Sequence, residues 1–280
     1  MKLFRFGPAG AEKPGVMLGD ERVDASAFGS DWDEAFFGGD GLSRLAAWVR
    51  AEAPRAPRVA AGVRLGPAVA RPSKLVCIGL NYRDHARETG AAIPTEPVIF
   101  LKATSALAGP DDDLPLPPGA EKLDHEVELA LVIGQRAKNV TPEAAPAHVA
   151  GYVLHNDYSE RGFQKERGGQ WTKGKGCDGF APLGPFLVTP DECPRAGAAV
   201  IWLNVNGEPR QKSSTLEMIF DVPTLVSYVS QFMTLLPGDV LSTGTPAGVG
   251  MGRQPPLYLR RGDLVEYGID GLGSARHRIA

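Results

Sequence analysis

Short apolar runs separated by Gly, Pro and Asp dominate the chain after residue 70. Such runs predict β-strands, because strands are usually roughly four to eight residues long and are bounded by turn-forming residues. The runs are LVCIG (75–79), PVIFLK (97–102), EVELALVIG (126–134), GYVLHND (151–157), PFLVT (185–189), AVIWLNVNG (199–207), DVLSTG (239–244) and DLVEYGI (263–269). The pattern predicts a mainly β (α+β) architecture with helical insertions.

Two segments instead repeat their apolar residues at helical spacing. The first is GLSRLAAWVRAEA (41–53), and Asp40 before it is a candidate N-cap. The second is PTLVSYVSQFMTL (223–235), which follows Asp221 as a candidate N-cap and carries Pro223 near its first turn. Its expected apolar stripe consists of Leu225, Val226, Val229, Phe232 and Met233.

The first 60 residues form a small unit of their own, with KLFRF and GVML as short strand candidates before the helix at 41–53. A passage rich in Pro, Ala and Arg follows, from Pro54 to Pro72, and is typical of a connector on the surface. We therefore expect a small N-terminal α+β domain with its connector at 1–70 and a larger domain at 71–280.

Composition excludes several functional classes. The 280 residues carry a net charge of −3 and no long run of Lys or Arg, which argues against nucleic-acid and membrane-surface partners. MKLFRFGPAG is not a signal peptide, and no apolar run approaches the ~20 residues of a membrane span, so a cytoplasmic protein is expected. Cys77, Cys177 and Cys193 are widely spaced and are interpreted as reduced and structural.

The run DHEVELALVIG (124–134) places two carboxylates on one face of an apolar strand. Glu126 and Glu128 are two residues apart, so their side chains point the same way, about 7 Å apart along the strand. On a buried strand they would repel unless a cation neutralised them, whereas on a solvated sheet edge they need no partner. Asp157, at the end of the next strand, offers a third carboxylate, and three such oxygens favour Mg²⁺, Mn²⁺ or Ca²⁺ over Zn²⁺.

Two further segments contain candidate catalytic residues. In IGLNYRDHARETG (78–90), His85 and Glu88 are three apart and adjacent on a helical turn, as in a general base or a surface ion pair. Gly79 and Gly90 flank them as candidate hinges of a lid at 81–95. In RGGQWTKGKGCDGFAPLGP (167–185), Lys173 and Lys175 stand among glycines, either in a flexible loop or as a fixed charge for an oxyanion.

In order, the motifs IGLNYRDHARETG, DHEVELALVIG, GYVLHNDYSER, WTKGKGCDGFAPLGP, VNGEPRQ and LPGDVLSTGTPAGVG closely resemble the fumarylacetoacetate hydrolase family over residues 72–280. The resemblance implies a rolled β-sheet catalytic domain, a homodimer, and one Mg²⁺ or Mn²⁺ (Ca²⁺ in some members) per subunit. DHEVEL and NDYSER replace the more frequent D-Y-E-x-E-L and NDVSAR, which bears on substrate fit more than on metal binding.

The resemblance also implies a role for individual residues. Glu126, Glu128 and Asp157 correspond to metal ligands, His85 and Glu88 to a water-activating pair, and Lys175 to the lysine that stabilises substrate charge. Thr245 matches a position that contacts the substrate carboxylate, and Tyr82, Arg83 and Gln164 are further candidates for the pocket.

The implied reaction is hydrolysis of the C3–C4 bond of a 2,4-diketo acid to pyruvate and a carboxylic acid. The closest subgroup in appearance is the acylpyruvate hydrolase-like 2,4-diketo-3-deoxy-L-fuconate or rhamnonate hydrolases of sugar acid catabolism. Oxaloacetate decarboxylation, isomerisation or decarboxylation of a dioic acid, and a ureidoglycolate lyase-type reaction remain alternatives on the same scaffold. A metal-dependent binding protein without turnover is a more remote alternative.

Overall fold

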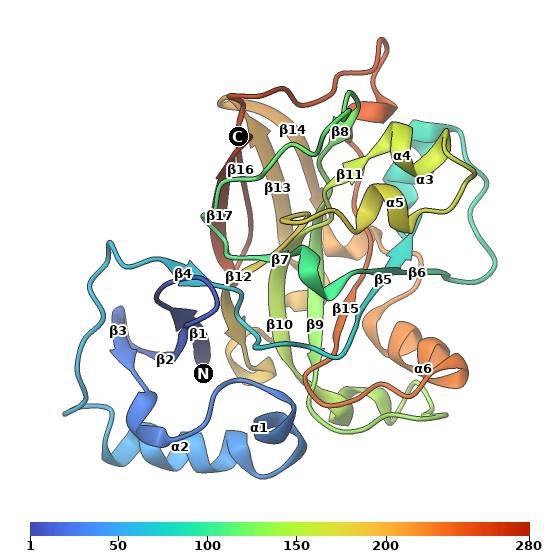
Figure 1. Ribbon diagram of the computed structural model, residues 1–280. Coiled ribbons are helices and arrows are strands. Elements are labelled where there is room, and N and C mark those ends of the chain that lie inside the picture. The colour runs from blue at the N-terminus through green and yellow to red at the C-terminus, as the bar shows by residue number, and fades with distance from the viewer.

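The computed structural model describes residues 1–280, and a long mixed β-sheet runs through it (Figure 1). Its eleven strands are β1 (Lys2–Phe6), β2 (Lys13–Leu18), β3 (Glu21–Asp24), β4 (Leu65–Gly66), β5 (Leu75–Gly79), β6 (Val98–Lys102), β7 (Leu107–Ala108), β9 (Val127–Ile133), β10 (Val149–Asn156), β12 (Ala181–Val188) and β15 (Val240–Ser242). The main order is β3-β2-β1-β12-β10-β9-β15-β5-β6, with β4 beside β1 and β7 beside β12. The strands expected from the apolar runs at 75–79, 97–102, 126–134 and 151–157 are therefore confirmed.

A second sheet packs against the first. Its four antiparallel strands, in the order β14-β13-β16-β17, are β13 (Val200–Val205), β14 (Glu208–Ser214), β16 (Leu264–Ile269) and β17 (Gly273–Arg278). Two short strands, β8 (Leu123–Asp124) and β11 (Ser159–Glu160), pair beside them. The expected sheet-rich α+β fold with few helices is confirmed.

Six α-helices surround the sheets (Figure 1). They are α1 (Glu34–Gly38), α2 (Gly41–Ala51), α3 (Arg83–Thr89), α4 (Arg161–Lys165), α5 (Thr172–Lys175) and α6 (Val222–Phe232). Helices α3, α4 and α5 gather at the upper right of the view, and α6 lies below them on the same side (Figure 1). None of these helices is both long and apolar enough to span a bilayer.

Strand β9 is buried on both faces, because layers cover it on each side. Every residue from Val127 to Ile133 is buried. Leu131 and Ile133 pack with Leu225 and Val226 of α6, whereas Val127 and Leu129 belong to the main core shared with the second sheet. Burying an apolar side chain of this size is worth roughly 1.5–3 kcal/mol, so the centre of the sheet is a rigid platform.

The two expected helix caps differ in the structure. Asp221 caps α6 as predicted, since its carboxylate accepts a hydrogen bond of 3.0 Å from the backbone N–H of Thr224. Asp40 precedes α2 but makes no capping bond; its carboxylate pairs with the Arg44 guanidinium at 2.7 Å instead. The predicted stripe on α6 also loses a member, because Phe232 at the helix end is 61% exposed.

The N-terminal unit shares the core of the larger one. Strand β1 pairs with β12, placing Leu3 opposite Leu187, and the main core contains Leu3 and Trp32 together with residues of both sheets. Arg64 adds a bidentate ion pair to Asp112 with both distances at 2.6 Å. The amino-acid composition changes near residue 70, where the boundary was predicted. The hydrophobic core, however, continues from one unit into the other.

Candidate active site

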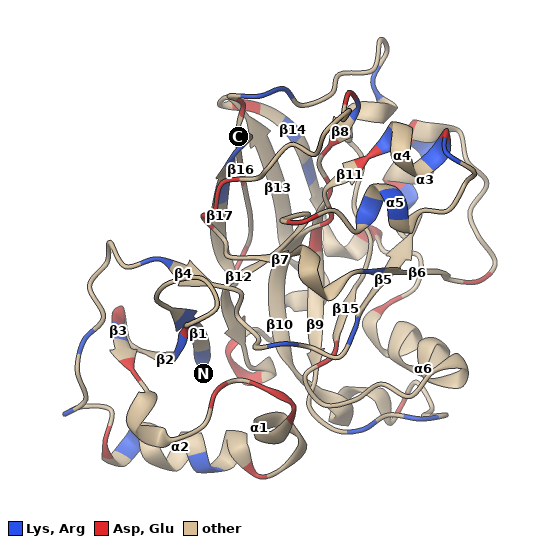
Figure 2. Ribbon diagram, viewed as in Figure 1, with Lys and Arg blue, Asp and Glu red and all other residues tan.

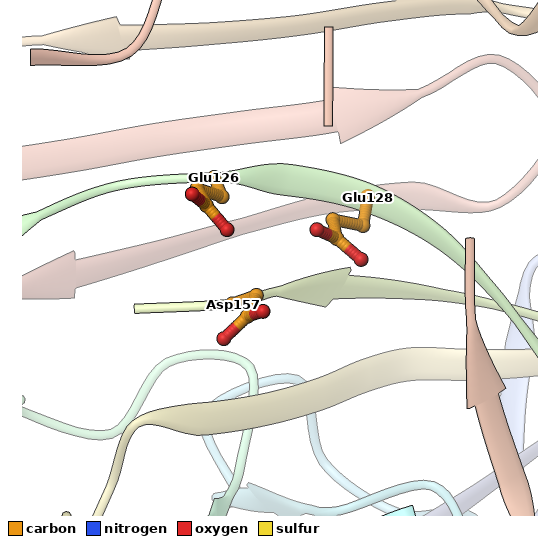
Figure 3. A group of neighbouring side chains, drawn as sticks. All are labelled: Glu126, Glu128 and Asp157. Carbon is orange, nitrogen blue, oxygen red and sulfur yellow. The ribbon is translucent and has the colours of Figure 1, made fainter. Parts of the chain in front are cut away.

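Three carboxylates meet where β9 begins and β10 ends. Glu126 and Glu128 flank Val127 at the start of β9, and Asp157 follows Asn156 at the end of the neighbouring antiparallel strand (Figure 3). One oxygen from each lies within 4.8 Å of the others, and all three residues are buried. Antiparallel pairing of two central strands therefore assembles the cluster that the sequence predicts.

Buried cations neutralise part of this negative charge. The guanidinium of Arg161 donates to Glu126 at 2.5 Å, and the ammonium of Lys175 donates to Glu126 at 2.6 Å and to Asp157 at 2.9 Å. Lys102, at the end of β6, pairs with the second oxygen of Asp157. Figure 2 shows positive residues on α4 and α5, the helices that supply Arg161 and Lys175.

The charge balance leaves one negative charge without a partner. Within the cluster and its ion pairs, the buried carboxylates are those of Asp124, Glu126, Glu128 and Asp157, and the buried cations are Lys102, Arg161 and Lys175. The buried Glu160 lies outside this set, since it accepts only from backbone N–H groups. Glu128 receives no cation: burial and the charges of Asp157 and Glu126 raise its pKa well above the usual range. Burial alone would also raise the pKa of Glu126, but the positive charges of Arg161 and Lys175 outweigh burial, so the pKa of Glu126 is lowered.

These residues fit a hard divalent cation. Glu128 uses one oxygen to accept from Ser242 Oγ at 2.5 Å and from the Gly244 N–H at 3.0 Å, and the other oxygen has no donor. An oxygen-only donor set with uncompensated negative charge is the chemistry that Mg²⁺ and Mn²⁺ prefer.

His85, of the predicted pair on α3, lines a cavity that Glu126 and Glu128 also line. His85 Nδ1 lies 3.0 Å from Glu88 Oε2, and the other oxygen of Glu88 accepts from the Gly248 N–H at 2.8 Å. Because Nδ1 donates to the carboxylate, Nε2 carries the free lone pair. His85 is 8% exposed and lines the cavity beside Glu126.

That cavity has a volume of about 320 Å³. Six of its lining residues are the buried polar groups at and beside the carboxylate cluster, and this part is called the inner end: Glu126, Glu128, Arg161, Gln164, Lys175 and Thr245. The remaining walls consist of Ile78, Gly79, Leu80, His85, Thr89, Ala91, Phe100, Lys165, Trp171 and Met251. A larger open hollow of about 1120 Å³ lies beside the N-terminal unit, where Arg5 pairs with Asp31 and Glu12. None of the predicted site residues lines this hollow, so the smaller cavity is the better candidate site.

The cavity includes Gln164 and Thr245 of the predicted substrate contacts. Gln164 is 2% exposed, and its carbonyl oxygen accepts from Arg161 at 3.1 Å, which leaves its NH₂ group available. The hydroxyl of Thr245 donates to the Val127 carbonyl at 2.9 Å and accepts from Gln211 at 2.8 Å. Contact between this hydroxyl and a substrate would require it to exchange one of those partners.

The other two predicted contacts lie elsewhere. Tyr82 is fully buried and Arg83 is exposed, and neither lines the cavity. Arg83 instead donates to the backbone carbonyls of Leu216, at 3.5 Å, and Met218, at 2.5 Å. Lys173 is also exposed and donates to the Arg167 carbonyl at 2.7 Å, whereas Lys175 reaches the carboxylates.

Sequence reasoning missed several residues of this site. Asp124 accepts from Arg161 at 2.9 Å and from the backbone N–H groups of Gly250 and Met251 at 2.6 and 3.0 Å, which fastens the 250–252 segment to the carboxylate cluster. Lys102 was a detectable signal, because it is the one charged residue in the apolar run PVIFLK. Arg161 is the last residue of the motif NDYSER, which follows the predicted strand at 151–157. A positive charge so close to Asp157 in sequence was a second detectable signal.

Comparisons with known proteins agree with this arrangement. A family model described as fumarylacetoacetate (FAA) hydrolase C-terminal matches residues 74–280. A protein of Burkholderia multivorans, described as a hydrolase without a stated substrate, is 49% identical over 275 residues, covering 98% of this chain and 96% of that protein.

Solved structures are similar over the whole chain. Fumarylacetoacetate hydrolase from Exiguobacterium antarcticum has 39% identity and a TM-score of 0.84, and the match covers 100% of this chain and 99% of that one. Maleylpyruvate hydrolase from Sphingobium sp. SYK-6, solved with manganese(II) and pyruvate, has 31% identity, a TM-score of 0.83 and the same coverage. The resemblance noted from the motifs is therefore confirmed: the chain belongs to the fumarylacetoacetate hydrolase family.

Proposed function

We propose that this protein hydrolyses the C3–C4 bond of a 2,4-diketo acid, such as an acylpyruvate, to pyruvate and a carboxylic acid. One observation carries the proposal: a histidine oriented by a carboxylate faces the same cavity as a three-carboxylate cluster. The cluster alone would serve any reaction through an enolate. The oriented histidine adds the means to activate water.

The residues of the cluster have separate roles in this reaction. Glu126, Glu128 and Asp157 would hold a divalent cation, which when bound supplies a Lewis acid for the C1 carboxylate and C2 oxygen of the substrate. Arg161 and Lys175 keep Glu126 ionised and fixed, because each donates to one of its two oxygens. The ligands are thus preorganised before substrate binds.

His85 acts as the general base. Its Nε2 takes a proton from water, so that hydroxide adds to the C4 carbonyl, and Glu88 stabilises the imidazolium that forms. The C3–C4 bond then breaks, its electron pair forms the enolate of pyruvate, and the acyl group leaves as a carboxylic acid. Protonation at C3 completes pyruvate, so that one water is consumed overall.

Lys175 stabilises the charge that develops on the enolate. Burial acts to lower its pKa, but the charges of Asp157 and Glu126 outweigh burial, so the pKa of Lys175 is raised and the ammonium persists at neutral pH. Two of its three N–H groups bind those carboxylates, and the third is available to substrate. The free NH₂ group of Gln164 is a second donor at the inner end.

The comparisons support this class of substrate. The Sphingobium protein is a maleylpyruvate hydrolase and was solved with manganese(II) and pyruvate, the metal and product that the proposal requires. The Exiguobacterium protein is named a fumarylacetoacetate hydrolase. Another structure of similar fold, from Mycobacterium abscessus, is named a probable 2-hydroxyhepta-2,4-diene-1,7-dioate isomerase, so the fold also supports isomerisation.

The outer walls of the cavity bear on the acyl part of the substrate. Ile78, Phe100, Trp171 and Met251 are apolar, and the polar side chains among these walls are Thr89, Lys165 and the proposed base His85. Trp171 is fixed edge-on against Phe100, with ring centroids 5.3 Å apart. These walls favour a largely apolar acyl group over the hydroxylated tail of a 2,4-diketo-3-deoxy sugar acid, which stays the second candidate on the motif resemblance.

The reaction is tested by pyruvate release from EDTA-stripped protein, with and without Mg²⁺ or Mn²⁺. The substrates are acetylpyruvate, a longer acylpyruvate, a 2,4-diketo-3-deoxy sugar acid and oxaloacetate, and the second product is identified in each case. Metal-dependent pyruvate with the matching carboxylic acid is expected. Release of CO₂ from oxaloacetate alone would make the protein a decarboxylase and remove the need for a base.

His85→Ala separates the base from the metal site. We expect kcat to fall by about 10²–10⁴, the usual contribution of a general base, while Mn²⁺ affinity stays within about threefold of the wild type. His148→Ala, at a half-exposed histidine outside the cavity, is the matched control. Unchanged turnover in His85→Ala would show that water is activated by another group.

A further inference from the structure

His155 is a buried histidine one strand away from the cluster, and the proposed reaction gives it no role. We propose that it is a positioning residue for the metal site: through the hydroxyl of Ser242 it holds Glu128 with one oxygen directed away from the protein donors and free for the ion. The inference rests on the metal required by the proposed function. It concerns how the third ligand is oriented before the ion binds.

The contacts form a continuous chain. His155 Nδ1 lies 2.8 Å from Ser242 Oγ, and Ser242 Oγ lies 2.5 Å from Glu128 Oε2. The Gly244 N–H reaches the same carboxylate oxygen at 3.0 Å. His155, Ser242 and Glu128 are each 1% exposed, so water does not compete for these groups.

The register of the sheet explains why these three side chains meet. Strand β9 lies between β10 and β15; His155 of β10 is paired with Glu128, and Ser242 of β15 is paired with Ala130. Glu128 and Ala130 are two residues apart and share a face, so all four side chains lie on the same side of the sheet. Ala130 carries only a methyl group, which leaves space for His155 and Ser242 to meet.

Counting protons fixes the direction of the chain. With the ion bound, Glu128 is a carboxylate that can only accept, so Ser242 donates its one hydroxyl proton to Glu128 and its oxygen accepts from His155 Nδ1–H. The Nε2 atom of His155 is then an acceptor, and it is buried without any hydrogen-bond partner. A buried group without a partner is unfavourable, which indicates that the Nδ1 donor is the reason a histidine stands here.

The consequence falls on the two oxygens of Glu128. Both donors, Ser242 and Gly244, bind Oε2, and no donor reaches Oε1. Without the Ser242 hydroxyl the carboxylate could rotate, and each metal-binding event would have to restrict it again. Groups that orient a metal ligand in this way typically change metal affinity by roughly 10–100-fold when they are replaced.

Two substitutions at one position test the hydrogen bond directly. The amide nitrogen of Asn is the same number of bonds from Cα as Nδ1, whereas that of Gln is one bond further. Full-length protein stripped with EDTA is titrated with Mn²⁺ by calorimetry. We expect His155→Asn to stay within about threefold of the wild-type Kd, and His155→Gln and Ser242→Ala to bind about 10–100-fold more weakly.

Ser230→Ala is the matched control for Ser242→Ala. Ser230 lies on α6, is equally buried, and donates a hydrogen bond of 2.8 Å to the Ser227 carbonyl. It makes no contact with the carboxylate cluster. Its removal should cost similar stability in urea unfolding and leave the Mn²⁺ affinity unchanged. If a His155 variant does not fold, Ser242→Ala compared with Ser230→Ala decides the question alone.

The outcomes separate this inference from the proposed function. Wild-type Mn²⁺ affinity in both His155→Gln and Ser242→Ala would overturn the positioning role. So would an equal loss of Mn²⁺ affinity in His155→Asn and His155→Gln combined with no loss in Ser242→Ala. Tight binding to the wild type and its loss in Glu128→Ala would leave the metal site standing in either case. Absence of Mn²⁺ binding to the wild type would instead overturn the metal site and this inference together.

Discussion

His277 is fully buried and lies between two tyrosine rings. Its ring centroid is 5.6 Å from that of Tyr158 and 5.5 Å from that of Tyr267. Burial lowers the pKa of His277 to about 4, and the charge of Asp112 opposes this shift only in part. The imidazole is therefore neutral in the folded protein at pH 7.

A lowered histidine pKa makes stability depend on pH. In the unfolded chain the pKa is about 6.5, so below that pH the unfolded state binds a proton that the folded state excludes until about pH 4. Stability from this residue is complete above pH 6.5 and is lost as the pH falls. At pH 5 the loss relative to pH 7 is about 2 kcal/mol.

His277→Phe keeps the aromatic packing and removes the titration. The free energy of unfolding is measured in urea at pH 7 and at pH 5. Its decrease from pH 7 to pH 5 should be about 2 kcal/mol smaller in this variant than in the wild type. The half-exposed His148, replaced by Gln, is the control and should keep the wild-type slope. A slope in His277→Phe equal to the wild type would assign the acid sensitivity to other groups.

Gly252 is required by the residue it touches. A Cβ atom at this position would lie 2.6 Å from Glu88 Cδ and 2.8 Å from Glu88 Oε2. Glu88 would have to move, and its contacts of 3.0 Å to His85 and 2.8 Å to Gly248 would be lost or lengthened. The carboxylate end is flexible, so the effect falls on its position more than on folding.

Gly252→Ala should therefore lower kcat by about 10–100-fold, since displacing a catalytic group by about 1 Å can cost 10² in rate. The free energy of unfolding should change by less than about 1 kcal/mol. Gly62→Ala is the control, because open space surrounds that position. Wild-type kcat in Gly252→Ala would mean that Glu88 tolerates displacement and does not orient the base.

At the scale of the element, two helices of equal length begin after an aspartate and yet start differently. The first residue of α6 follows Asp221, whose extended backbone lets its carboxylate accept from Thr224 N–H. Asp40 has φ −91° and ψ 16°, a conformation in which no capping bond forms, and its side chain reaches Arg44. The sequence pattern is the same, and the local backbone decides the role.

Replacing each aspartate by alanine should show this difference. Asp221→Ala removes a cap and is expected to cost about 1 kcal/mol of unfolding free energy. Asp40→Ala removes only an exposed ion pair and should cost less than about 0.5 kcal/mol. Both are measured in urea at constant pH, and equal losses would show that the capping bond at α6 contributes nothing of its own.

The strands that the sequence predicted have apolar runs, and the longer ones it missed are polar. Strand β14 reads EPRQKSS and β17 reads GSARHR, with four of the six residues of β17 exposed. Both lie at the edges of the second sheet, where side chains face solvent and hydrophobic alternation is weak. Hydrogen bonding to a neighbouring strand, which no local pattern reveals, defines them.

The same limit applies to the site. The triad of Glu126, Glu128 and Asp157 could be predicted because its members lie on adjacent strands close in sequence. Lys175 was predicted from its motif as a charge for the substrate, but its contacts with Glu126 and Asp157 were not, nor was the pairing of Lys102 with Asp157. These lysines come from distant segments, and only the folded sheet brings them within hydrogen-bond distance of the cluster. Gln211, whose amide holds Thr245 at 2.8 Å, is another such case.

For the whole molecule, the continuous core predicts that the two composition-defined units do not separate. A fragment of residues 71–280 would expose the edge of β12 that β1 covers, together with the apolar side chains that face Leu3 and Trp32. We expect it to be insoluble or to unfold without cooperativity, as measured by circular dichroism and urea titration beside the full chain. A soluble fragment that binds Mn²⁺ would show instead that residues 71–280 form an autonomous domain.

Oligomeric state also belongs to this scale. The homodimer implied by the family resemblance stays a prediction, and light scattering coupled to size exclusion would measure it directly. A mass near twice 29.8 kDa is the expected result.

The metal ligands and the base come from parts of the fold with different neighbours. The ligands are fixed by the centre of the sheet, whereas His85 and Glu88 lie on a single seven-residue helix that is joined to the rest of the site by the Gly248 N–H. Under the proposed function, replacing that one helix would remove the general base and leave the carboxylate cluster with Arg161 and Lys175 intact. The proposed hydrolysis therefore depends on one short peripheral helix, whereas the proposed stabilisation of an enolate depends on the centre of the sheet.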